Sequence, residues 1–560
     1  MKKAFFVLMF FCSFPCFFFF FIDSLQSIKL DEILVNPLRN VQPKRKIAQQ
    51  IESVSKNEIE FHNMPTSADV LANTGKLSIQ KSQQGGGSPV IRGFEASRIL
   101  LLVDGVRMNN LIYRAGHLQN SITVDKNMLE KVDVLFGPSS TIFGSDALGG
   151  AIYLQTKSAK LLSQIDNKKW SGNLMSNYST VNEGKSAHVD LNYASQQWAS
   201  LSSVSFNEFG DLKMGKKRNG SNDFFGERPF YVETMNGVDQ QVANGNKYVQ
   251  KFSGYKQYDF MQKVVYQPNS NLTHSLNLQY STTSDIPRYD RLTDLSSNGN
   301  LRSAVWKYGP QKRFLSIYKI TKDQVFKNTK MNLNVSYQNV EESRINRNFG
   351  SSKLNSRIEK VSVIALSSDF TTKINQANLT YGVDIYRDGL QSTAFQENIL
   401  TGAETDLDTR YPDGNNSTLR AEGFVSFSDN FTPEVSYNIS ARAGYSYLKS
   451  EMDTNFFNLP FTAIEQHNTT YSGAFGIVNN PTKNIKLAFN LASAYRVPNI
   501  DDMAKIFEST PGLLIVPNEN IKPEKTVTAD VSVTLWDGNR FQFENVFYVT
   551  KLYDPIRTDL

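Results

Sequence analysis

The chain has 560 residues, a formal net charge of +6 and a mean hydropathy of −0.38. So many residues exceed one ordinary hydrophobic core, and so low a mean hydropathy excludes a bundle of membrane-spanning helices. The basic residues are scattered along the chain, which argues against nucleic-acid binding. Aromatic residues make up 12% of the sequence. This combination suits a membrane β-barrel, in which only alternate side chains face lipid.

The first residues indicate export from the cytoplasm. Lys2 and Lys3 precede an apolar run from Phe5 to Ile22, which is the charge and length pattern of a secretory signal peptide. A single membrane anchor is the alternative interpretation, because the run is nearly long enough to span a bilayer. We interpret residues 1–24 as the signal peptide.

The cysteines and the missing catalytic motifs restrict the chemistry. Cys12 and Cys16 both lie in the leader, so we expect no disulfide, thiolate metal site or cysteine nucleophile in the exported chain. The sequence contains no H-E-x-x-H, no G-x-S-x-G and no metal-spaced group of Cys or His. We therefore expect no enzymatic activity and no intrinsic cofactor. The remaining function classes are binding and transport.

Residues 25–46 form a polar segment that is short of core residues. Within it, an acidic and then apolar stretch consists of Asp31, Glu32, Ile33, Leu34 and Val35. This stretch could be the first strand of the following domain. It could also be an extended peptide that adds to the sheet edge of a partner. The residues alone leave both interpretations open.

Residues 47–160 predict a compact α+β domain, because short apolar runs alternate with glycine turns. Thr66, followed by an acidic residue three positions later, predicts a helix start. Leu100 to Val103 predicts a buried strand that ends in the turn Asp104-Gly105. Val132 to Phe136 predicts a second strand, closed by Gly137-Pro138.

Two further features complete this domain. Ser139 and Ser140 offer hydroxyls that could cap a short helix extending to Ala147, and Ala151 to Thr156 predicts a third strand. Residues 109–120 lack periodicity and predict a loop, which carries Tyr113, Arg114 and His117.

Residues 165–560 have a different texture, since apolar and polar residues alternate along strand-length segments. The stretches 276–280, 331–337, 485–491 and 531–535 carry apolar residues at every second position. This pattern is typical of a membrane β-barrel, although a soluble sandwich alternates too. Tight turns at one end and long polar stretches at the other favour the barrel.

The long polar stretches are expected to be extracellular loops. The main ones are residues 210–251, 284–312, 343–358 and 391–420.

Four short motifs then give a specific resemblance. They occur in the order Ile91-Arg92-Gly93-Phe94, Leu102-Val103-Asp104-Gly105-Val106, Val134-Leu135-Phe136-Gly137-Pro138-Ser139-Ser140 and Phe143-Gly144-Ser145-Asp146-Ala147-Leu148-Gly149-Gly150. In series they resemble the plug domain of TonB-dependent outer-membrane receptors. The matching positions are Arg92, Gly93, Asp104, Gly105, Gly137, Pro138, Gly144, Gly149 and Gly150. The family often has arginine where this chain has Phe136, so a polar contact at that position is in doubt.

This resemblance implies an α+β plug domain inside a mainly antiparallel transmembrane β-barrel of about 22 strands. It also implies that Asp31 to Val35 is similar to the TonB box, a periplasmic peptide that binds TonB. The implied location is the bacterial outer membrane, with a monomeric chain surrounded by lipid. Family barrels usually end in a strand with a terminal aromatic residue, whereas this sequence ends in Asp559-Leu560. We therefore expect that C-terminal barrel strands are missing here.

Two segments resemble the haem and haemoglobin receptor branch of the family. Tyr495-Arg496-Val497-Pro498 is similar to its FRAP box, and residues 517–521 are similar to its NPNL box. That branch usually has a histidine between the boxes, but residues 499–516 contain none. The resemblance therefore makes Tyr495 and Arg496 candidate ligand contacts, and His117 with Tyr113 candidate haem ligands in place of the absent histidine.

Three functions remain in competition. The first is a TonB-coupled importer of an iron compound, possibly haem. The second is the same kind of transporter with a siderophore, cobalamin or a saccharide as cargo. The third is an outer-membrane binding protein without energy coupling.

Overall fold

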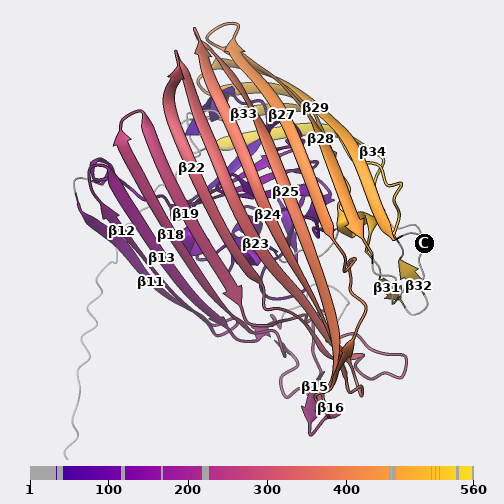
Figure 1. Cartoon of the computed structure of the whole chain (residues 1–560). Helices are drawn as coiled ribbons and strands as arrows, with labels where there is room; N and C mark the ends of the chain where they lie inside the picture. The colour runs from indigo at the N-terminus through magenta and orange to yellow at the C-terminus, as the bar shows by residue number, and fades with distance from the viewer. Residues whose placement is uncertain are drawn as a thin grey trace, which may run out of the picture.

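The computed structural model describes residues 42–114, 120–165, 168–216, 226–452, 462–505, 517–537 and 541–557, together with 33–34, 39, 456, 507–510 and 513–515. A small α+β domain is surrounded by one large curved antiparallel sheet (Figure 1). We call the small domain the plug and the large sheet the wall. The expected fold class, a plug with a large antiparallel β structure around it, is confirmed.

The plug is built on a five-stranded sheet with the order β3-β9-β10-β7-β8. β10 runs parallel to β7 and antiparallel to β9. A second, three-stranded sheet and three short helices cover it. The bounds of these elements are β3 (Ile51–Ser55), α1 (Lys56–His62), α2 (Ser67–Asn73), β4 (Ser78–Gln80), β5 (Ser88–Ile91), β6 (Phe94–Glu95), β7 (Ile99–Val103), β8 (Val106–Arg107), β9 (Leu129–Phe136), α3 (Ser140–Phe143) and β10 (Gly150–Thr156).

Local sequence explains most of these elements. The three predicted strands correspond to β7, β9 and β10, and their apolar residues are almost fully buried. Thr66 caps α2 by accepting a hydrogen bond from the backbone of Asp69 at 3.3 Å, as predicted. Ser55 and Glu58 form a capping box on α1, which stabilises a helix start by satisfying otherwise free N–H groups.

The predicted helix from Ser139 to Ala147 is wrong in its length and its cap. The helix α3 has only four residues. The Ser139 hydroxyl donates to the Gly137 carbonyl at 3.1 Å, and the Ser140 hydroxyl donates to the Tyr495 carbonyl at 3.3 Å. The Ser139 side chain therefore stabilises a turn and the Ser140 side chain contacts the wall, so neither caps the helix.

The wall contains eighteen strands. In order they are β11 (Trp170–Ser179), β12 (Gly184–Ala194), β13 (Trp198–Phe209), β18 (Tyr255–Asn269), β19 (Leu272–Thr283), β20 (Ile286–Pro287), β21 (Ser303–Tyr308), β22 (Lys312–Phe326), β23 (Thr329–Asn348), β24 (Lys353–Ile374), β25 (Ala377–Asn398), β26 (Glu404–Asp406), β27 (Asn416–Asn430), β28 (Val435–Glu451), β29 (Ala463–Thr482), β30 (Ile485–Arg496), β33 (Glu524–Trp536) and β34 (Gln542–Tyr553). The expectation of further strands stays a prediction.

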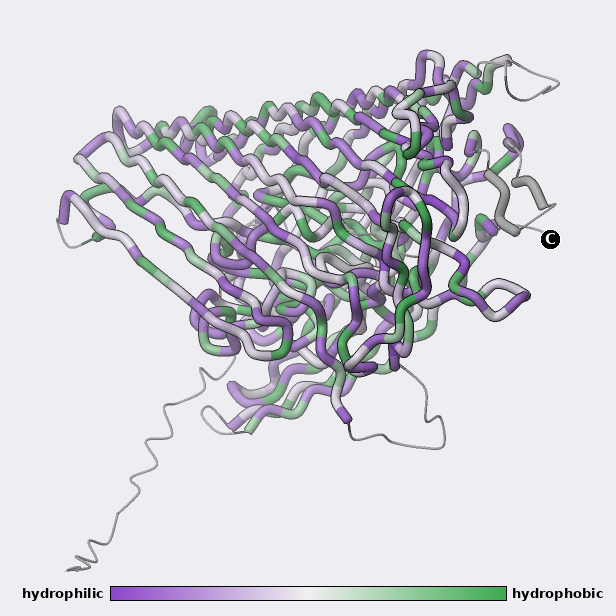
Figure 2. The backbone as a smooth tube through the Cα atoms, turned by 90° about the horizontal axis from the view of Figure 1, so that it is seen from below, coloured by the Kyte–Doolittle hydropathy of each residue, from purple (hydrophilic) through white to green (hydrophobic). Residues whose placement is uncertain are grey.

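Hydrophobic and hydrophilic residues alternate along the strands of the wall, as Figure 2 shows. On β19, Leu276 and Tyr280 are 38% and 42% exposed on the outer face, whereas Asn277 and Gln279 are buried against the plug. A water-soluble sandwich would place its apolar side chains inside. Apolar residues outside and polar residues inside are the arrangement of a membrane β-barrel.

The two ends of the wall differ in their connections. Tight turns join β22 to β23 at Phe326 and Thr329, and β24 to β25 at Ile374 and Ala377. At the opposite end, the connection from β13 to β18 carries the hairpin β15 (Phe230–Met235) and β16 (Val238–Ala243), which projects beyond the wall (Figure 1). Short turns face the periplasm and long loops face the exterior in bacterial barrels.

Two of the predicted loops are wrong in extent. Residues 343–348 and 353–358 belong to β23 and β24, and residues 391–398 belong to β25. These polar strand ends continue the antiparallel ladder, with Ser343 paired to Ile358 and Lys353 to Asn398. The polar composition of these segments reflects their exposure to solvent. Their backbones are nevertheless paired, so the strands extend beyond the apolar band.

None of the helices in the described ranges is both long and apolar enough to cross a membrane.

The outward face of the wall can be tested with one lysine at a time. Ile364 is 57% exposed on the outer face of β24, whereas Thr371 on the same strand lines a polar cavity on the inner side. We expect Ile364→Lys to cost about 2–4 kcal/mol of unfolding free energy in lipid, because lysine loses hydration on the lipid face. Thr371→Lys should cost much less. Urea unfolding from lipid vesicles measures both, and equal costs would contradict this orientation of the strands.

Candidate functional site

Buried ion pairs hold the plug against one half of the wall. Arg92 lies 2.6 Å from Asp530 on β33, and Arg98 lies 2.7 Å from Glu524 on the same strand. Asp530 and Glu524 are both buried. Because a charge that loses water needs a close partner, each pair fixes the plug at a definite height against β33.

The linker before the plug contributes a further ion pair. Arg39 donates two hydrogen bonds to Asp384 on β25, at 3.0 and 2.9 Å. Arg442 on β28 also contacts Asp384, and its Nε donates to Glu422 on β27 at 2.8 Å. Asp384 and Arg442 have fully buried side chains. The segment that enters the plug is thus tied to an ion network on three neighbouring wall strands, β25, β27 and β28.

The helix α3 sits directly on this network. Arg442 donates to the carbonyl of Ile142 at 3.2 Å. Gly144 has a backbone φ of +79°, and a methyl group added there would overlap the carboxylate of Glu422. The network therefore joins linker, plug and wall, and glycine at 144 is required by both its backbone conformation and the close approach of Glu422.

Tyr495 and Arg496, the predicted ligand contacts, are both buried in this interface. The Tyr495 hydroxyl donates to Glu422 at 2.7 Å. Arg496 binds Glu524 at 3.0 Å and Asp502 at 2.5 Å. These side-chain bonds lie within the wall and brace the end of β30 to which the plug attaches. A contact with cargo there stays a prediction.

Backbone groups extend this attachment. The carbonyl of Tyr495 accepts from the Asp146 amide at 3.1 Å, and the Val497 amide donates to the Ser145 hydroxyl at 3.0 Å. On the plug side, Arg107 holds the same turn through Asp146 at 2.5 Å. The Phe-Gly-Ser-Asp motif of the plug therefore contacts the box Tyr495 to Pro498 at the end of β30.

The plug apex points toward the long-loop end of the wall. Tyr113 and Arg114 are buried there, and Arg114 lies 3.4 Å from Glu342. The Asn499 side chain donates to the Tyr113 carbonyl at 2.5 Å. His117 lies outside the described residues, so its predicted role as a ligand stays a prediction.

A small helix covers this apex. It is α4 (Ile500–Met503), and its Asp501 accepts a hydrogen bond from Tyr411 at 2.7 Å. Burial alone would raise the pKa of Asp501, but Lys505, Arg410 and the Tyr411 hydrogen bond lower it to about 2. Burial also raises the pKa of Tyr411 to about 12. Asp501 is thus a stable anion among cations close to the predicted ligand loop.

Asp104 connects the plug to the other half of the wall. It accepts from Thr156 inside the plug and from Asn277 on β19 at 2.8 Å, and it lies 3.2 Å from Lys263 on β18. Lys157 of the plug lies 2.6 Å from Asp190 on β12. The Asp-Gly turn of the second plug motif is therefore an attachment point as well as a turn.

Phe136, where the family often has arginine, is buried in the plug core. The Arg92 guanidinium lies 6.0 Å from its ring centroid and 4.2 Å from that of Tyr548 on β34. Phe136 itself therefore packs in the apolar core, and Arg92 beside it pairs with Asp530 at 2.6 Å.

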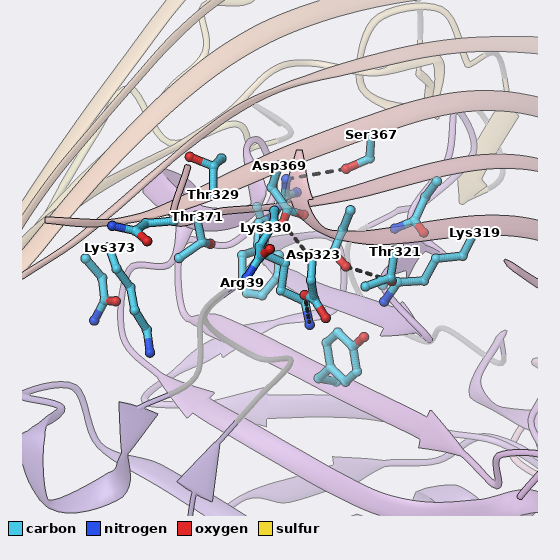
Figure 3. Close-up of a pocket in the computed structure, with 18 of the residues that line it drawn as sticks. Arg39, Lys319, Thr321, Asp323, Thr329, Lys330, Ser367, Asp369, Thr371 and Lys373 are labelled. Atoms are coloured by element: carbon cyan, nitrogen blue, oxygen red, sulfur yellow. Dashed lines mark hydrogen bonds and ion pairs between the residues drawn. The ribbon is translucent and has the colours of Figure 1, made fainter. Parts of the chain in front are cut away.

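A large cavity separates the plug from β22, β23 and β24 at the short-turn end (Figure 3). Its volume is about 1060 Å³. The plug contributes Asp104, Gly105 and Tyr153, and the linker contributes Arg39 and Lys46. Such a volume matches that of cavities which enclose small molecules, although its position is far from the apex.

The predicted TonB box is described only in part. Ile33 and Leu34 form a short strand β1 that pairs antiparallel with β2 (Gln42–Pro43). Asp31, Glu32 and Val35 lie outside the described residues. The backbone at 33–34 adopts the extended form that strand addition requires, and the assignment as a TonB box stays a prediction.

Sequence reasoning missed most wall partners of the plug. None of the charged residues of this network belongs to a motif: Arg39, Asp384, Glu422, Arg442 and Asp530. Asp384, the ion-pair partner of Arg39, is 345 positions away from it. One usable signal was present, since charged residues at inward positions of membrane strands need a partner in the lumen. No group of three or more His, Cys, Asp or Glu residues suited to a metal ion occurs in the described ranges.

The ion pair of Arg39 should hold the linker in place. We expect Arg39→Ala to weaken this attachment by about 1.5–3 kcal/mol, the range for hydrogen bonds to charged groups. The measurement is the rate of protease cleavage within residues 39–50 of the membrane-inserted protein. Lys46→Ala is the control, because Lys46 makes one hydrogen bond to Asn430 at 3.1 Å. Equal cleavage of the two variants would contradict this role of Arg39.

The close approach at Gly144 predicts a second effect. We expect Gly144→Ala to loosen the plug, because the methyl group meets Glu422. In addition, the backbone there, with φ +79° and ψ −153°, is in a region adopted essentially by glycine alone and costs alanine about 1–3 kcal/mol. Gly93→Ala is the matched control, since Gly93 has a similar φ of +82° and open space around it. Protease digestion of the plug, with the wall still intact on a gel, compares them. If both variants resist digestion equally, the proposed contact is wrong.

Comparisons with known proteins agree with this architecture. Residues 43–151 match the TonB-dependent Receptor Plug Domain, and residues 257–560 match the TonB dependent receptor-like β-barrel. Heme/hemopexin utilization protein C of Haemophilus influenzae is 21% identical over 574 residues, which cover 95% of this chain and 73% of the relative.

A second relative matches over a shorter region. Vitamin B12 transporter BtuB of Vibrio vulnificus (strain CMCP6) is 36% identical over 135 residues, 23% of this chain. That match spans 21% of the length of the relative, so the activity of the whole relative is not transferred.

Two solved structures share the fold. Copper transporter OprC has a TM-score of 0.69 at 15% identity, covering 93% of this chain and 73% of that chain. The Serratia marcescens hemophore receptor HasR, solved as a double mutant with its hemophore HasA and heme, has a TM-score of 0.69 at 13% identity, covering 90% and 73%. Since the barrel match alone spans more than half of the sequence, the chain belongs to the family of TonB-dependent receptors.

Proposed function

We propose that the protein imports an iron compound, with haem as the first candidate, across the bacterial outer membrane in a TonB-coupled step. The observation that carries this proposal is the attachment of the N-terminal linker to the wall through Arg39 and Asp384. A pull on the linker must break this buried pair before it reaches the plug. A pulling force on the linker would therefore reach the contact between plug and wall through this ion pair.

In the proposed cycle, the periplasmic partner TonB adds a strand to the segment Asp31 to Val35. Residues 33–34 pair with 42–43 in the resting protein, so TonB competes for an existing short ladder. Backbone hydrogen bonds give such strand addition its affinity. After TonB binds, the pull separates Arg39 from Asp384 and loosens α3 from Glu422 and Arg442.

Cargo capture is assigned to the plug apex and the loops around it. Arg114, Arg344 and Arg410 lie among the carboxylates Glu342, Glu359 and Asp501 there. A cargo with carboxylate groups could replace these partners, because arginine binds carboxylates with two parallel hydrogen bonds. The proposed iron ligands are His117 and Tyr113, and Tyr495 and Arg496 support the apex from below.

Haem is favoured over other cargoes by two observations of sequence. The relative that matches 95% of this chain is named for heme and hemopexin utilization, and the two boxes at 495–498 and 517–521 resemble the same branch. The cobalamin transporter matches over only 23% of this chain. A siderophore, cobalamin or a saccharide remains the second candidate.

Binding of haemin tests the cargo. We expect purified protein mixed with haemin to shift the Soret band, because a protein ligand to ferric iron changes its coordination. His117→Ala should weaken or abolish that shift, and His467→Ala is the control, since His467 lies on β29 beside Tyr445 and Tyr447. A Soret band unchanged by the wild-type protein would exclude haem and leave the second candidate.

Energy coupling is tested separately with Ile33→Pro. Proline lacks the backbone N–H that strand addition uses, so we expect haemin uptake to stop while surface binding persists. Ile33→Leu keeps the N–H and should behave as the wild type. Undiminished uptake by Ile33→Pro would favour the uncoupled binding protein.

A further inference from the structure

The long connection between β13 and β18 is a folded module at the outer end of the wall. It contains the hairpin β15–β16, which projects beyond the wall (Figure 1). At its base, β14 (Leu212–Lys213) pairs antiparallel with β17 (Val249–Gln250). Further along, the Arg228 amide donates to the Lys247 carbonyl at 2.7 Å. The two halves of the connection are therefore joined by backbone hydrogen bonds, which bring charged residues from both halves together.

One buried arginine that packs against this module is fully paired. Arg347 on β23 donates two hydrogen bonds to Asp239 on β16, at 2.8 and 2.7 Å, and a third to the Thr234 hydroxyl at 2.8 Å. The side chains of Arg347 and Asp239 are 3% and 1% exposed. This arrangement is the usual one, because a charge that loses water needs a close opposite charge.

A second arginine, inside the module, lacks such a partner. Arg228 is 1% exposed, and its Nε and Nη1 make no hydrogen bond within the part of the chain that the structure describes. The carboxylate that attracts it is Asp211, but Asp211 Oδ1 already accepts the amides of Ser253 and Gly254, at 2.7 and 3.1 Å. Burial lowers the pKa of Arg228 to about 10. The guanidinium is thus still charged at neutral pH, and its charge is poorly compensated by the protein.

Two exposed lysines add to the positive charge of this module. The ammonium groups of Lys247 and Lys216 lie 5.5 and 5.6 Å from the ring centroid of Tyr248, so both cations gather around one ring. Lys247 also pairs with Glu227 at 3.0 Å. The module therefore brings three cations together, Arg228 included, while the two nearby carboxylates are already bonded. Such a group of cations attracts anions.

We propose that Arg228, with Lys216 and Lys247, binds a phosphate group on the outer side of the protein. A phosphate group offers up to two negative charges and three strong acceptor oxygens, and arginine binds it through charge-assisted hydrogen bonds. Arg228 provides the buried bond, and the two lysines provide the attraction from solvent. The phosphate belongs to a free anion or to a lipid headgroup, which the experiments below distinguish. This inference concerns the connection between β13 and β18 and does not rest on the proposed import function.

Calorimetric titration of the whole purified protein with inorganic phosphate tests the free anion. If the ligand is free phosphate, binding should saturate, and Arg228→Met should weaken it by about tenfold or more, because a charge-assisted hydrogen bond is lost. Lys213→Gln is the control, since it also removes a cation from the module. Lys213 pairs with Glu183 at 2.7 Å, and both side chains are exposed, so this variant should stay within about twofold of the wild type. Sodium chloride at equal ionic strength shows how much of the signal is screening.

Cleavage by chymotrypsin within residues 226–252 separates binding from a merely structural role. Without any phosphate ligand, Arg228→Met should be cut more slowly than the wild type, because methionine removes a poorly compensated buried charge. The ligand should slow cleavage of the wild type and leave cleavage of Arg228→Met unchanged. Faster cleavage of Arg228→Met without ligand would mean that the protein itself satisfies the guanidinium, and the inference would be wrong.

The source of the phosphate is identified by repeating the cleavage on protein inserted into lipid vesicles. Protection by inorganic phosphate in vesicles of phosphatidylcholine alone would assign a free anion. Protection only in vesicles that also contain phosphatidic acid, whose headgroup is a phosphate monoester, would assign a lipid. Either result supports the inference if Arg228→Met abolishes the protection. The inference is overturned if neither inorganic phosphate nor phosphatidic acid protects the wild type, or if Arg228→Met is protected equally well.

Discussion

The burial of charge inside a polar lumen is the constraint on which this structure depends. Membrane strands place every second side chain toward the lumen, and here many of these side chains are charged. A charge out of contact with water must be paired. The plug and its linker supply Arg39, Arg92 and Arg98 to Asp384, Asp530 and Glu524. The wall therefore requires the plug, and the plug is located by the charges of the wall.

Such pairs suit a closure that must open. A buried ion pair adds little net stability relative to a well-packed apolar contact, yet removing one partner alone is costly. The ion pairs consequently fix the position of the plug more than they add to its binding energy. A wholly apolar interface of the same area would hold the plug more firmly. It would also expose a large, aggregation-prone apolar surface when the plug moved.

Much of the fold could be predicted from local patterns. The alternation along β19 and β30 predicted which face meets lipid, and the apolar runs at β7, β9 and β10 predicted the plug sheet. The interface could not be predicted, because Arg39 and Asp384 are brought together only by the tertiary arrangement of segments 345 positions apart. The roles of Ser139 and Ser140 as helix caps were wrongly predicted for the same reason. The hydrogen-bond partner of Ser140 is Tyr495, which lies 355 positions later in the sequence.

The candidate site, like the fold, could be predicted from the sequence only in part. The boxes at Tyr495 and 517–521 were found by resemblance, but the resemblance did not reveal that Tyr495 and Arg496 are bonded to Glu422, Glu524 and Asp502. The residues predicted as ligand contacts are therefore members of the ion network at the end of β30.

The central claim is that paired charges hold linker and plug to the wall, and a double-mutant cycle on Arg39 and Asp384 tests it directly. The variants are Arg39→Gln, Asp384→Asn and the double substitution, and the observable is the urea concentration at which amides of Ile99–Val103 begin to exchange. Interacting charges should give a coupling free energy of at least about 1 kcal/mol. Strictly additive effects would contradict the claim.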